Sequence, residues 1–336
     1  MKLSEIGEFG LISRFSPPFL KHLPEGVLGI GDDAAVISRS GEPSLLVTID
    51  TLVEEIHFLR DKTSPRDLGE KSLAVNLSDI AAMGGRPTSA FLALGLPSTT
   101  TVEWIDEFFD GLYRLAAQEG VVLLGGDTTR SPGPIMITLT VLGSVEPSQI
   151  KRRSDARSGD ILCVTGPLGD SAGGLRVMLE GCEQGVDERV LLEHHHRPRA
   201  HLREGRWLGS QPGVRAMMDV SDGIDSDVRH IMEQSSCGAR IALERLPVSE
   251  ELRSAAGRHA WDLTELVMSG GEDYCLLLTV DHEAMSAVAR GFAAEFGREL
   301  DAIGTITAAA GRLELLRQGQ PARLGKHGFD HFLGTP

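Results

Sequence analysis

The sequence predicts an α/β (α+β) fold in two domains, and three observations indicate it. Segments with strand patterns alternate with segments of helical period, with no linker rich in Pro, Gly and Ser between them. The chain has 336 residues, which is longer than a domain with a single hydrophobic core usually is. A polar, basic stretch, Lys151-Arg152-Arg153-Ser154, interrupts the pattern near the middle. We therefore predict an N-terminal domain over 1–150 and a C-terminal domain over 151–336.

The elements of the first half follow from local patterns. Residues 2–15 have helical periodicity, and apolar runs at 34–37 and 45–49 predict strands, the second ending at Asp50. The strongest helix begins after the N-cap Ser64, with Pro65 at its first position, and ends at Gly84-Gly85. A second helix is predicted over 100–119, a buried strand over 121–124 and a long strand over 135–145.

The second half repeats the alternation. A strand at 161–165 leads through a Gly-rich turn to a helix at 172–179, and a later helix begins near 225–227. Further strands are predicted at 216–220, 239–243 and 274–280, with a final pair near Ile303 and Leu313. The run His194-His195-His196 predicts a solvated loop, because consecutive histidines on a polar segment do not point to one side.

Charge and composition disfavour several classes of protein. Lys plus Arg number 33 and Asp plus Glu 48, so the net charge of −15 disfavours nucleic acid and anionic membranes as partners. No stretch approaches the roughly 20 apolar residues of a membrane span, and no signal peptide is recognisable, so we expect a cytoplasmic protein. The 4 cysteines form no C-x-x-C pair, which excludes a zinc ribbon. A small-molecule substrate fits best.

Aspartates that follow small residues are the main functional signal. Each such segment alone is most simply a tight turn. Together they predict one shared site, because a metal cluster needs several acids at the ends of strands. Carboxylates and substrate phosphates are the ligands of Mg²⁺, so the set indicates magnesium-dependent phosphoryl transfer. The segments are Gly31-Asp32-Asp33, Thr48-Ile49-Asp50-Thr51, Asn76-Leu77-Ser78-Asp79, Gly125-Gly126-Asp127-Thr128-Thr129 and Asp219-Val220-Ser221-Asp222-Gly223.

Other motifs leave two interpretations open. Ser269-Gly270-Gly271-Glu272-Asp273 either opens a buried strand at the site or forms a hairpin turn. His57, seven residues after Asp50, either shares the site or lies at the surface. Arg153 is either a phosphate ligand at the domain junction or part of a solvated basic cluster. Neither the phosphate-binding G-x-x-x-x-G-K-[ST] loop nor the protein-kinase motif set occurs.

In these motifs the chain resembles the thiamine-monophosphate kinase family, part of the superfamily of aminoimidazole ribonucleotide synthetase and selenophosphate synthetase. The resemblance covers nearly the whole chain. It rests on the motifs at 7–12, 29–33, 50–53 with His57-Phe58, 74–84, 125–129, 164–166, 169–171, 197–198, 220–223, 269–274 and 328–332.

The resemblance implies an N-terminal domain that dimerises through a mixed sheet and a three-layer C-terminal domain, with ATP and several Mg²⁺ ions near the junction. The implied reaction converts ATP and thiamine phosphate to ADP and thiamine diphosphate, the last step of thiamine diphosphate biosynthesis. Implied metal-site residues are Asp33, Thr48, Asp50, Asp79, Asp127, Asp219 and Asp222. Implied ATP contacts are Tyr113, Gly126, Asp127, Arg153 and Ser221, and implied contacts to thiamine phosphate are His57, Glu272 and Phe329.

The implied acceptor is a phosphate, which needs no general base, because a phosphate monoester is largely deprotonated at neutral pH. Ile49 departs from the resemblance: relatives often carry a hydroxyl there, so only a backbone ligand is available. Two alternatives stay open, an aminoimidazole ribonucleotide synthetase-like ligase and a nucleotide-binding regulator without turnover.

Overall fold

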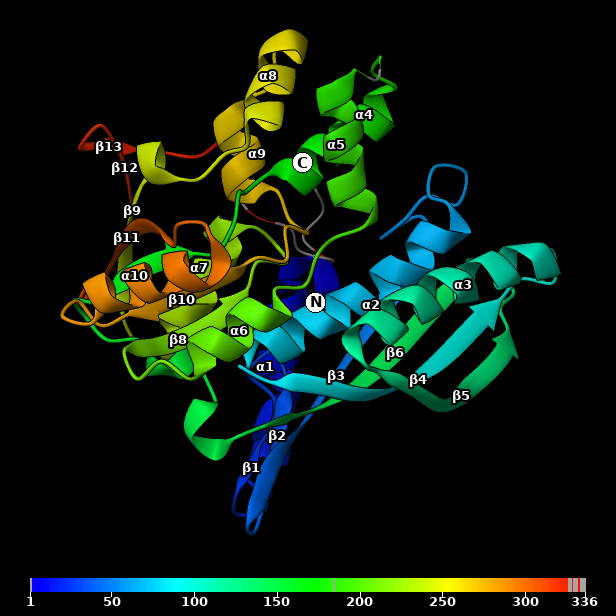
Figure 1. Ribbon diagram of the computed structural model, residues 1–336, viewed down its shortest axis with the longest axis horizontal. Coiled ribbons are helices and arrows are strands. Elements are labelled where there is room, and N and C mark those ends of the chain that lie inside the picture. Colours follow the sequence, from blue (N-terminus) through cyan, green and yellow to red (C-terminus); the bar gives the residue numbers. More distant parts are fainter. Residues whose placement is uncertain (1, 184, 326–327, 329–331, 333–336) are drawn as a thin grey trace.

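The structure is a computed structural model that describes residues 2–183, 185–325, 328 and 332. In this part of the chain the strands form two sheets, and helices cover both (Figure 1). The predicted mixed α/β class is therefore confirmed. Within the same residues, every helix is too short or too polar to cross a bilayer.

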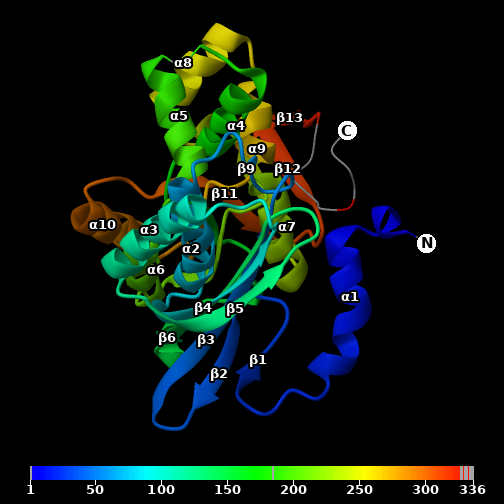
Figure 2. The same cartoon turned by 90° about the vertical axis from the view of Figure 1, so that its right-hand side faces the viewer.

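The first sheet contains, among the described residues, six strands in the order β1-β2-β3-β6-β4-β5. Strand β4 pairs with β5 in parallel and with β6 in antiparallel orientation. Helices α2 and α3 lie on one face of the sheet, and α1 stands apart on the other side (Figure 2). The bounds are β1 Val27–Leu28, β2 Ala35–Arg39, β3 Glu42–Val53, β4 Arg86–Leu96, β5 Val122–Arg130 and β6 Met136–Val145, with α1 Gly7–Leu20, α2 Pro65–Ala82 and α3 Val102–Glu119.

The second sheet has, in the described part, seven strands in the order β13-β12-β9-β11-β7-β10-β8. Successive residues of β10 point to opposite faces, and each face packs against helices, which gives three layers. The strands are β7 Ile161–Val164, β8 Val214–Asp219, β9 Gly238–Ala242, β10 Leu276–Val280, β11 Asp301–Thr307, β12 Leu313–Arg317 and β13 Gln320–Ala322. The helices are α4 Asp170–Glu180, α5 Val186–His196, α6 Leu202–Gly209, α7 Ile224–Gln234, α8 Glu250–His259, α9 Leu263–Ser269 and α10 Met285–Phe296.

Helix α2 lies between the two sheets and is buried on nearly all sides. Its start is confirmed, since the Ser64 hydroxyl accepts a hydrogen bond from the Asp67 N–H at 3.1 Å. Glycines allow its neighbours to come close. A Cβ at Gly111 of α3 would lie 1.9 Å from the Arg66 carbonyl oxygen, and one at Gly205 of α6 would lie 2.2 Å from that of Ala81. The helix is thus held tightly against both halves of the chain.

Three expectations about the first half differ from the structure. Helix α1 continues through Pro17 and Pro18. The residues whose carbonyls lose their donors, Ser13 and Arg14, are exposed, so water can bind these carbonyls. The strand predicted as buried, β5, is an edge strand exposed along its whole length in the single chain. Asp50 and Asp127 lie inside β3 and β5 rather than on turns after them, because both strands run further than their apolar residues.

Candidate functional site

Three of the predicted aspartates converge between the two sheets. Asp33 comes from the turn before β2, Asp79 from α2 and Asp219 from the end of β8, and their carboxylate oxygens lie within 4.8 Å of one another. The Thr48 hydroxyl of β3 donates a hydrogen bond to Asp79 Oδ2. Four elements, from both halves of the chain, therefore meet at one carboxylate group, here called the first acidic group.

The first acidic group concentrates negative charge away from water. Burial, and then the charges of neighbouring acids, raise the pKa values of Asp79 and Asp219 well above the usual range of a carboxyl. Burial and the Asp33 charge raise the pKa of Asp50 to about 6, so Asp50 lies in electrostatic reach of the group. Asp33 Oδ2 is buried, with no hydrogen-bond partner among the described residues. An all-oxygen donor set of this charge fits a hard cation such as Mg²⁺.

Arg153 supplies the positive charge beside the first acidic group. Its guanidinium donates to Asp33 Oδ1 at 2.6 Å, with the arginine side chain 16% exposed and the aspartate side chain 1% exposed. The backbone N–H of Arg153 donates to Asp32 Oδ1 at 2.8 Å. The interpretation of Arg153 as a solvated surface charge is therefore wrong, because two adjacent acids of the first half hold it at the junction.

A second acidic group consists of Asp222, Asp227 and His230, whose ligand atoms also lie within 4.8 Å of one another. Both carboxylate oxygens of Asp227 are buried without a hydrogen-bond partner in the described chain. Burial, and then the Asp222 charge, raise the pKa of Asp227 well above its usual range. Sequence reasoning missed Asp227 and His230, although their spacing of three on a helix places both on one face.

The loop that carries Glu272 is locked to the loop that carries Asp222. The Glu272 N–H donates to the Ser221 carbonyl oxygen at 2.7 Å, and the Tyr274 N–H donates to that of Val220 at 2.8 Å. A Cβ at Gly271 would lie 2.4 Å from Ser221 O, so glycine is needed for this approach. Glu272 has φ 64° and Tyr274 has φ 49°, conformations that L side chains rarely adopt. The segment is therefore a strained loop that packs against the loop carrying Asp222, and it is not a hairpin turn.

The histidine run is helical, so the prediction of a solvated loop is wrong. His194, His195 and His196 form the last turn of α5. Glu188, Leu191 and His195, spaced three and four apart, are buried on one face, and this periodicity was the missed signal. Burial, and then the nearby Lys71, lower the pKa of His195 to about 2, so this imidazole is neutral.

Two further candidate residues that the structure describes, His57 and Tyr113, lie outside the first acidic group. His57 is half-buried after β3, and its Nδ1 accepts a hydrogen bond from the Val53 N–H at 3.0 Å. Tyr113 on α3 is 71% exposed in the single chain. Phe329 lies outside the described residues, but its neighbour Gly328 lies against the second acidic group, where a Cβ would be 2.7 Å from Asp222 O.

Gly126 and Asp127 lie on the edge strand β5, away from Asp50. The register runs from Asp50 to Leu139, Leu92 and Gly126, so β6 and β4 separate β3 from β5. Three strand spacings amount to about 14 Å. Glycine is required at 126, since a Cβ there would lie 1.7 Å from Leu92 O. Asp50 and Asp127 of one chain are therefore too far apart to bind the same ion.

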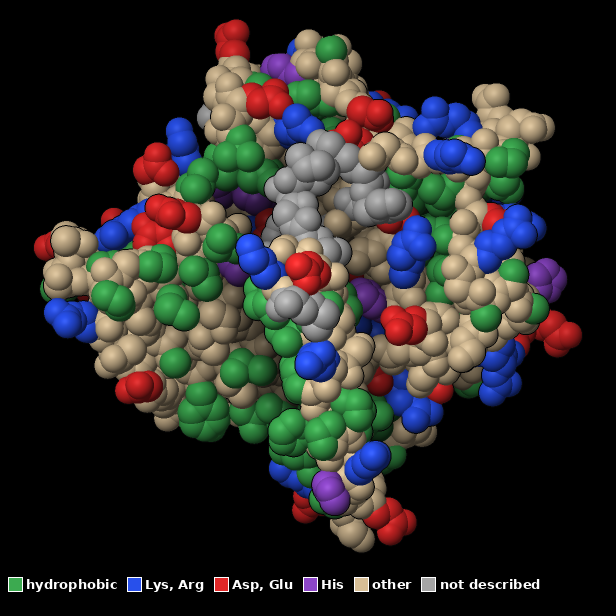
Figure 3. Space-filling view, turned by 180° about the vertical axis from the view of Figure 1, so that it is seen from behind, with side chains coloured by type: hydrophobic (Ala, Val, Ile, Leu, Met, Phe, Trp, Pro, Cys, Tyr) green, Lys and Arg blue, Asp and Glu red, His purple; other side chains and the backbone are tan. Residues whose placement is uncertain are grey.

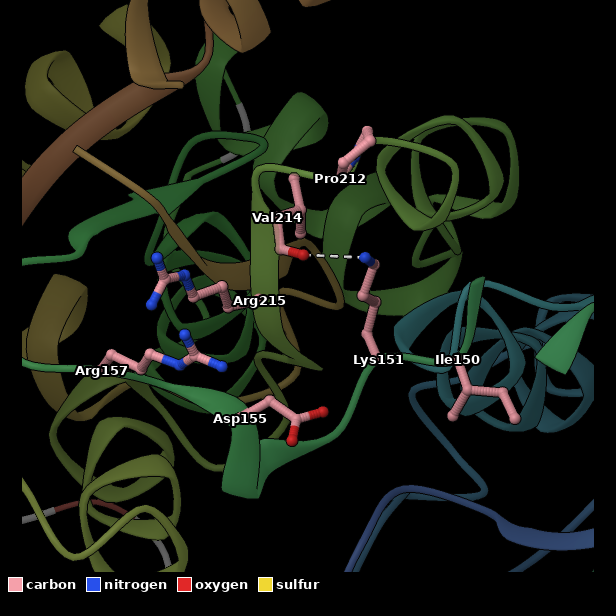
Figure 4. A pocket seen from close by; sticks show the side chains of 7 residues that line it. All are labelled: Ile150, Lys151, Asp155, Arg157, Pro212, Val214 and Arg215. Carbon is pink, nitrogen blue, oxygen red and sulfur yellow. Dashed lines mark hydrogen bonds between the residues drawn. The ribbon is translucent and has the colours of Figure 1, made fainter. Parts of the chain in front are cut away.

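A separate pocket of about 400 Å³ lies behind the basic stretch (Figure 4). Lys151, Arg157 and Arg215 line it together with Asp155. Lys151 Nζ donates to the carbonyl oxygens of Val214 at 2.7 Å and Gln211 at 3.3 Å. The lining includes none of the predicted site residues, and the lysine is already satisfied by backbone carbonyls.

Known proteins match both halves of the chain. The family model of the AIR synthase related protein N-terminal domain matches residues 31–145, and that of the C-terminal domain matches residues 157–315. Thiamine-monophosphate kinase of Escherichia coli (strain K12) is 40% identical, over 98% of this chain and 99% of that protein. Thiamine-monophosphate kinase of Bacillus subtilis (strain 168) is 35% identical, over 97% of this chain and 99% of that protein.

Solved structures agree with these matches. A structure described as AaThiL complexed with AMPPCP and TMP superposes with a TM-score of 0.86 at 32% identity, covering 99% of each chain. The hydrogenase maturation protein HypE of E. coli, at 19% identity and a TM-score of 0.66, shares the fold alone. Together, the domain matches and the relatives that align over nearly their whole length show that the chain belongs to the thiamine-monophosphate kinase family, among the AIR synthase related proteins.

Proposed function

We propose that this protein is a magnesium-dependent thiamine-monophosphate kinase, which transfers the γ-phosphoryl group of ATP directly to the phosphate of thiamine monophosphate. The observation that carries the proposal is the first acidic group, Asp33, Asp79 and Asp219, held beside Arg153. Acids this close repel polyphosphate unless cations lie between them. An acidic site with one buried arginine suits two anionic substrates only when divalent cations accompany them.

In this mechanism the chain binds and orients, and it removes no proton. Asp33, Asp50, Asp79 and Asp219, with Thr48, would hold the cations, and Asp222 with Asp227 would supply a second position. Magnesium, when bound, shields the charge of the two phosphate groups and favours their in-line approach. Arg153 contacts the polyphosphate of ATP, because a guanidinium matches phosphate oxygens with two parallel donors. The acceptor oxygen is already ionised at neutral pH.

Thiamine monophosphate would lie between the first acidic group and Glu272. The pKa of the Tyr274 hydroxyl lies well above its usual range, first through burial and then through the charges of Glu272, Asp50, Asp219 and Asp222. Tyr274 is therefore in electrostatic reach of both ends of the proposed site. The phosphate end would face the aspartates, and the aminopyrimidine end would face Glu272, with His57 and Phe329 as further contacts.

We further propose that two copies of the chain associate through the first sheet. Strand β5 is an unpaired edge in the single chain, with Val122 58% and Leu124 59% exposed. The sheet face away from α2 and α3, here called the open face, carries exposed Ile49 and Phe91. Hydrophobic side chains are visible over this side of the molecule in Figure 3. A long apolar edge and face of this kind favour pairing with a second copy. Sedimentation should give a dimer, and Leu124→Arg should give a monomer.

The dimer also explains the position of Asp127. Because Asp127 is about 14 Å from Asp50 across the sheet of its own chain, we propose that it serves the site of the partner copy. Tyr113 and Gly126 would contact ATP at the same interface. Since the reaction consumes ATP, we propose that the protein acts in the cytoplasm, which contains ATP.

The test is direct. The purified protein, incubated with ATP, Mg²⁺ and thiamine monophosphate, should form thiamine diphosphate and ADP in equal amounts. Chelation of the metal should stop the reaction, and added Mg²⁺ should restore it. Turnover with the aminoimidazole ribonucleotide synthetase substrate instead, or ATP binding without any transfer, would overturn the proposal in favour of a ligase or a regulator, respectively.

A further inference from the structure

Lys71 of α2 is a buried lysine that the proposed chemistry does not use. The residue is 1% exposed. Its Nζ forms an ion pair with Glu272 Oε1 at 2.8 Å and donates a hydrogen bond to the His195 carbonyl oxygen at 3.2 Å. Lysine is almost never buried to this degree without a partner. Its position therefore depends on the Glu272 carboxylate.

His195 lies beside the other oxygen of the same carboxylate. Its Nδ1 lies 3.3 Å from Glu272 Oε2 and 3.1 Å from the Ser171 hydroxyl. Nδ1 carries at most one proton, its hydrogen-bond partner is the Ser171 hydroxyl, and a proton on this nitrogen also faces Glu272 Oε2. Lys71 thus occupies one lone pair of Oε1, His195 lies against Oε2, and the carboxylate keeps further lone pairs.

The backbone of Glu272 is fixed as firmly as its carboxylate. Asp273, the next residue, accepts hydrogen bonds from the backbone N–H of Gly169 at 2.8 Å and of Ser171 at 3.4 Å, at the start of α4. The Glu272 N–H is bound to Ser221 O, and the residue keeps its φ of 64°. Strain of this kind persists only where the surroundings hold it, and it gathers at functional sites.

Stability alone does not account for this arrangement. A buried ion pair is often no more stabilising than an apolar pair of the same volume, because both charges lose their hydration. Lys71 and His195 have side chains that are 2% and 4% exposed, whereas that of Glu272 is 26% exposed. The buried charge and the buried imidazole therefore lie behind a carboxylate that keeps one accessible side.

We propose that Lys71 and His195 are positioning residues, which hold the Glu272 carboxylate so that its accessible side accepts a hydrogen bond from the amino group of the substrate's aminopyrimidine. This inference rests on the proposed function, in which thiamine monophosphate is the acceptor. Lys71 and His195 touch Glu272 and not the substrate. Their removal should weaken the binding of thiamine monophosphate and leave that of ATP unchanged.

Steady-state kinetics of Lys71→Met tests whether Lys71 is a positioning residue. The KM for thiamine monophosphate should rise by about 10–100-fold, the effect of losing a hydrogen bond to a correctly placed charge. The KM for ATP should stay within about 2-fold. Lys151→Met is the matched control, since Lys151 is also buried but its hydrogen bonds within the described residues go to backbone carbonyls. It should destabilise the protein without changing the KM for thiamine monophosphate.

Two further comparisons separate positioning from packing. His195→Leu should raise the KM for thiamine monophosphate, whereas His195→Asn, whose side-chain amide donates from nearly the position of Nδ1, should restore most of it. In the double variant Lys71→Met/Glu272→Gln, the KM should equal that of Glu272→Gln alone, because Lys71 acts through Glu272. This variant also removes both charges of the pair, so it is testable if Lys71→Met does not fold.

An analogue provides a readout that packing would not move. Thiamine monophosphate whose pyrimidine amino group is replaced by a carbonyl oxygen should be a poor substrate of the wild type. Lys71→Met should discriminate less than the wild type between thiamine monophosphate and this analogue. Additive effects in the double variant, or equal losses for ATP and thiamine monophosphate, would overturn the inference. If the wild type does not phosphorylate thiamine monophosphate at all, it is the proposed function that fails instead.

Discussion

Arg153 and Asp33 form an ion pair of 2.6 Å that links the turn before β2 to the segment that leads into the second sheet. Both partners are also candidate ligands, Arg153 for the polyphosphate and Asp33 for a cation. Each therefore satisfies the charge of the other as long as neither substrate nor metal is bound. When ATP and a cation bind, the ion pair between Arg153 and Asp33 would be replaced by a contact of Arg153 with the polyphosphate and a contact of Asp33 with the cation. Neither buried charge would then be left unpaired.

Replacement of Arg153 should affect ATP before it affects the acceptor. We expect Arg153→Met to raise the KM for ATP by about 10-fold or more, because a charge-assisted contact with phosphate is lost. Without divalent cations the variant should be less stable by about 3 kcal/mol, since Asp33 stays buried without its partner. The KM of Arg153→Lys for ATP should lie between those of the wild type and Arg153→Met, because lysine keeps the positive charge but lacks the planar guanidinium with its parallel donors. An unchanged KM for ATP would contradict this role.

Asp50→Asn should have opposite effects with and without metal. The pKa of Asp50 rises from its ordinary value of 3.8 to about 6, through burial and then the Asp33 charge. The metal-free wild type therefore loses stability as the pH rises from about 4 through about 6, whereas the uncharged asparagine does not. At about pH 7.5 the metal-free variant should be more stable, by on the order of 2–3 kcal/mol.

Magnesium should reverse this order, because it stabilises only the chain that can bind it tightly. Urea unfolding at several pH values, with and without Mg²⁺, measures both effects. Turnover of Asp50→Asn should fall together with its magnesium affinity. A variant with normal rate and normal metal dependence would remove Asp50 from the cation site.

Mixing two inactive variants should show whether Asp127 serves the partner copy. Each of Asp50→Asn and Asp127→Asn alone should be nearly inactive. After exchange of subunits, the mixture should recover about one quarter of the wild-type activity, because half of the dimers are mixed and each contains one intact site. The control mixture, Asp50→Asn with Asp79→Asn, should recover nothing, since both lesions fall in the site of their own chain. No recovery in the mixture of Asp50→Asn with Asp127→Asn, although its subunits have exchanged, would exclude the shared site.

Gly271→Ala should displace the loop that carries Glu272. The added Cβ would lie 2.4 Å from Ser221 O, so one of the two loops has to move. We expect the KM for thiamine monophosphate to rise by about 10-fold or more, with a lower melting temperature. Gly257→Ala on α8 is the control, because apart from the adjoining residues and the helix backbone no described atom lies within 4 Å of the added carbon there. That variant should be as active as the wild type and slightly more stable.

Local chemistry made α2 and α3 predictable. Ser64 and Pro65 begin α2, and Gly120 ends α3 with φ 71°, each for reasons that lie within a few residues. The exposure of β5 was not predictable, because an apolar run reads the same whether it is covered by its own chain or left at an edge. The burial of His195 likewise depends on Lys71 and Ser171, which are far away in the sequence.

The candidate site likewise contains residues that could be predicted from the sequence and residues that could not. The acids were identified as a set, and the convergence of Asp33, Asp79 and Asp219 agrees with that expectation, although its role as a metal site stays a prediction. Asp227 and Lys71 were missed because nothing in their local sequence distinguishes them from solvated charges. Only tertiary packing buries them, and burial is what makes their charge costly and their function worth testing.

The central position of α2 has a consequence for selectivity. Lys71 and Asp79 are eight residues apart on one rigid helix, which separates them by about 12 Å along its axis. Glycines of α3 and α6 let these helices pack closely against α2, so α2 cannot shift easily. The distance between the aminopyrimidine end and the phosphate end of the proposed site should therefore be fixed. An acceptor with one more or one fewer methylene between ring and phosphate would satisfy one end of the proposed site only, so we expect the helix to make the enzyme selective for acceptor length.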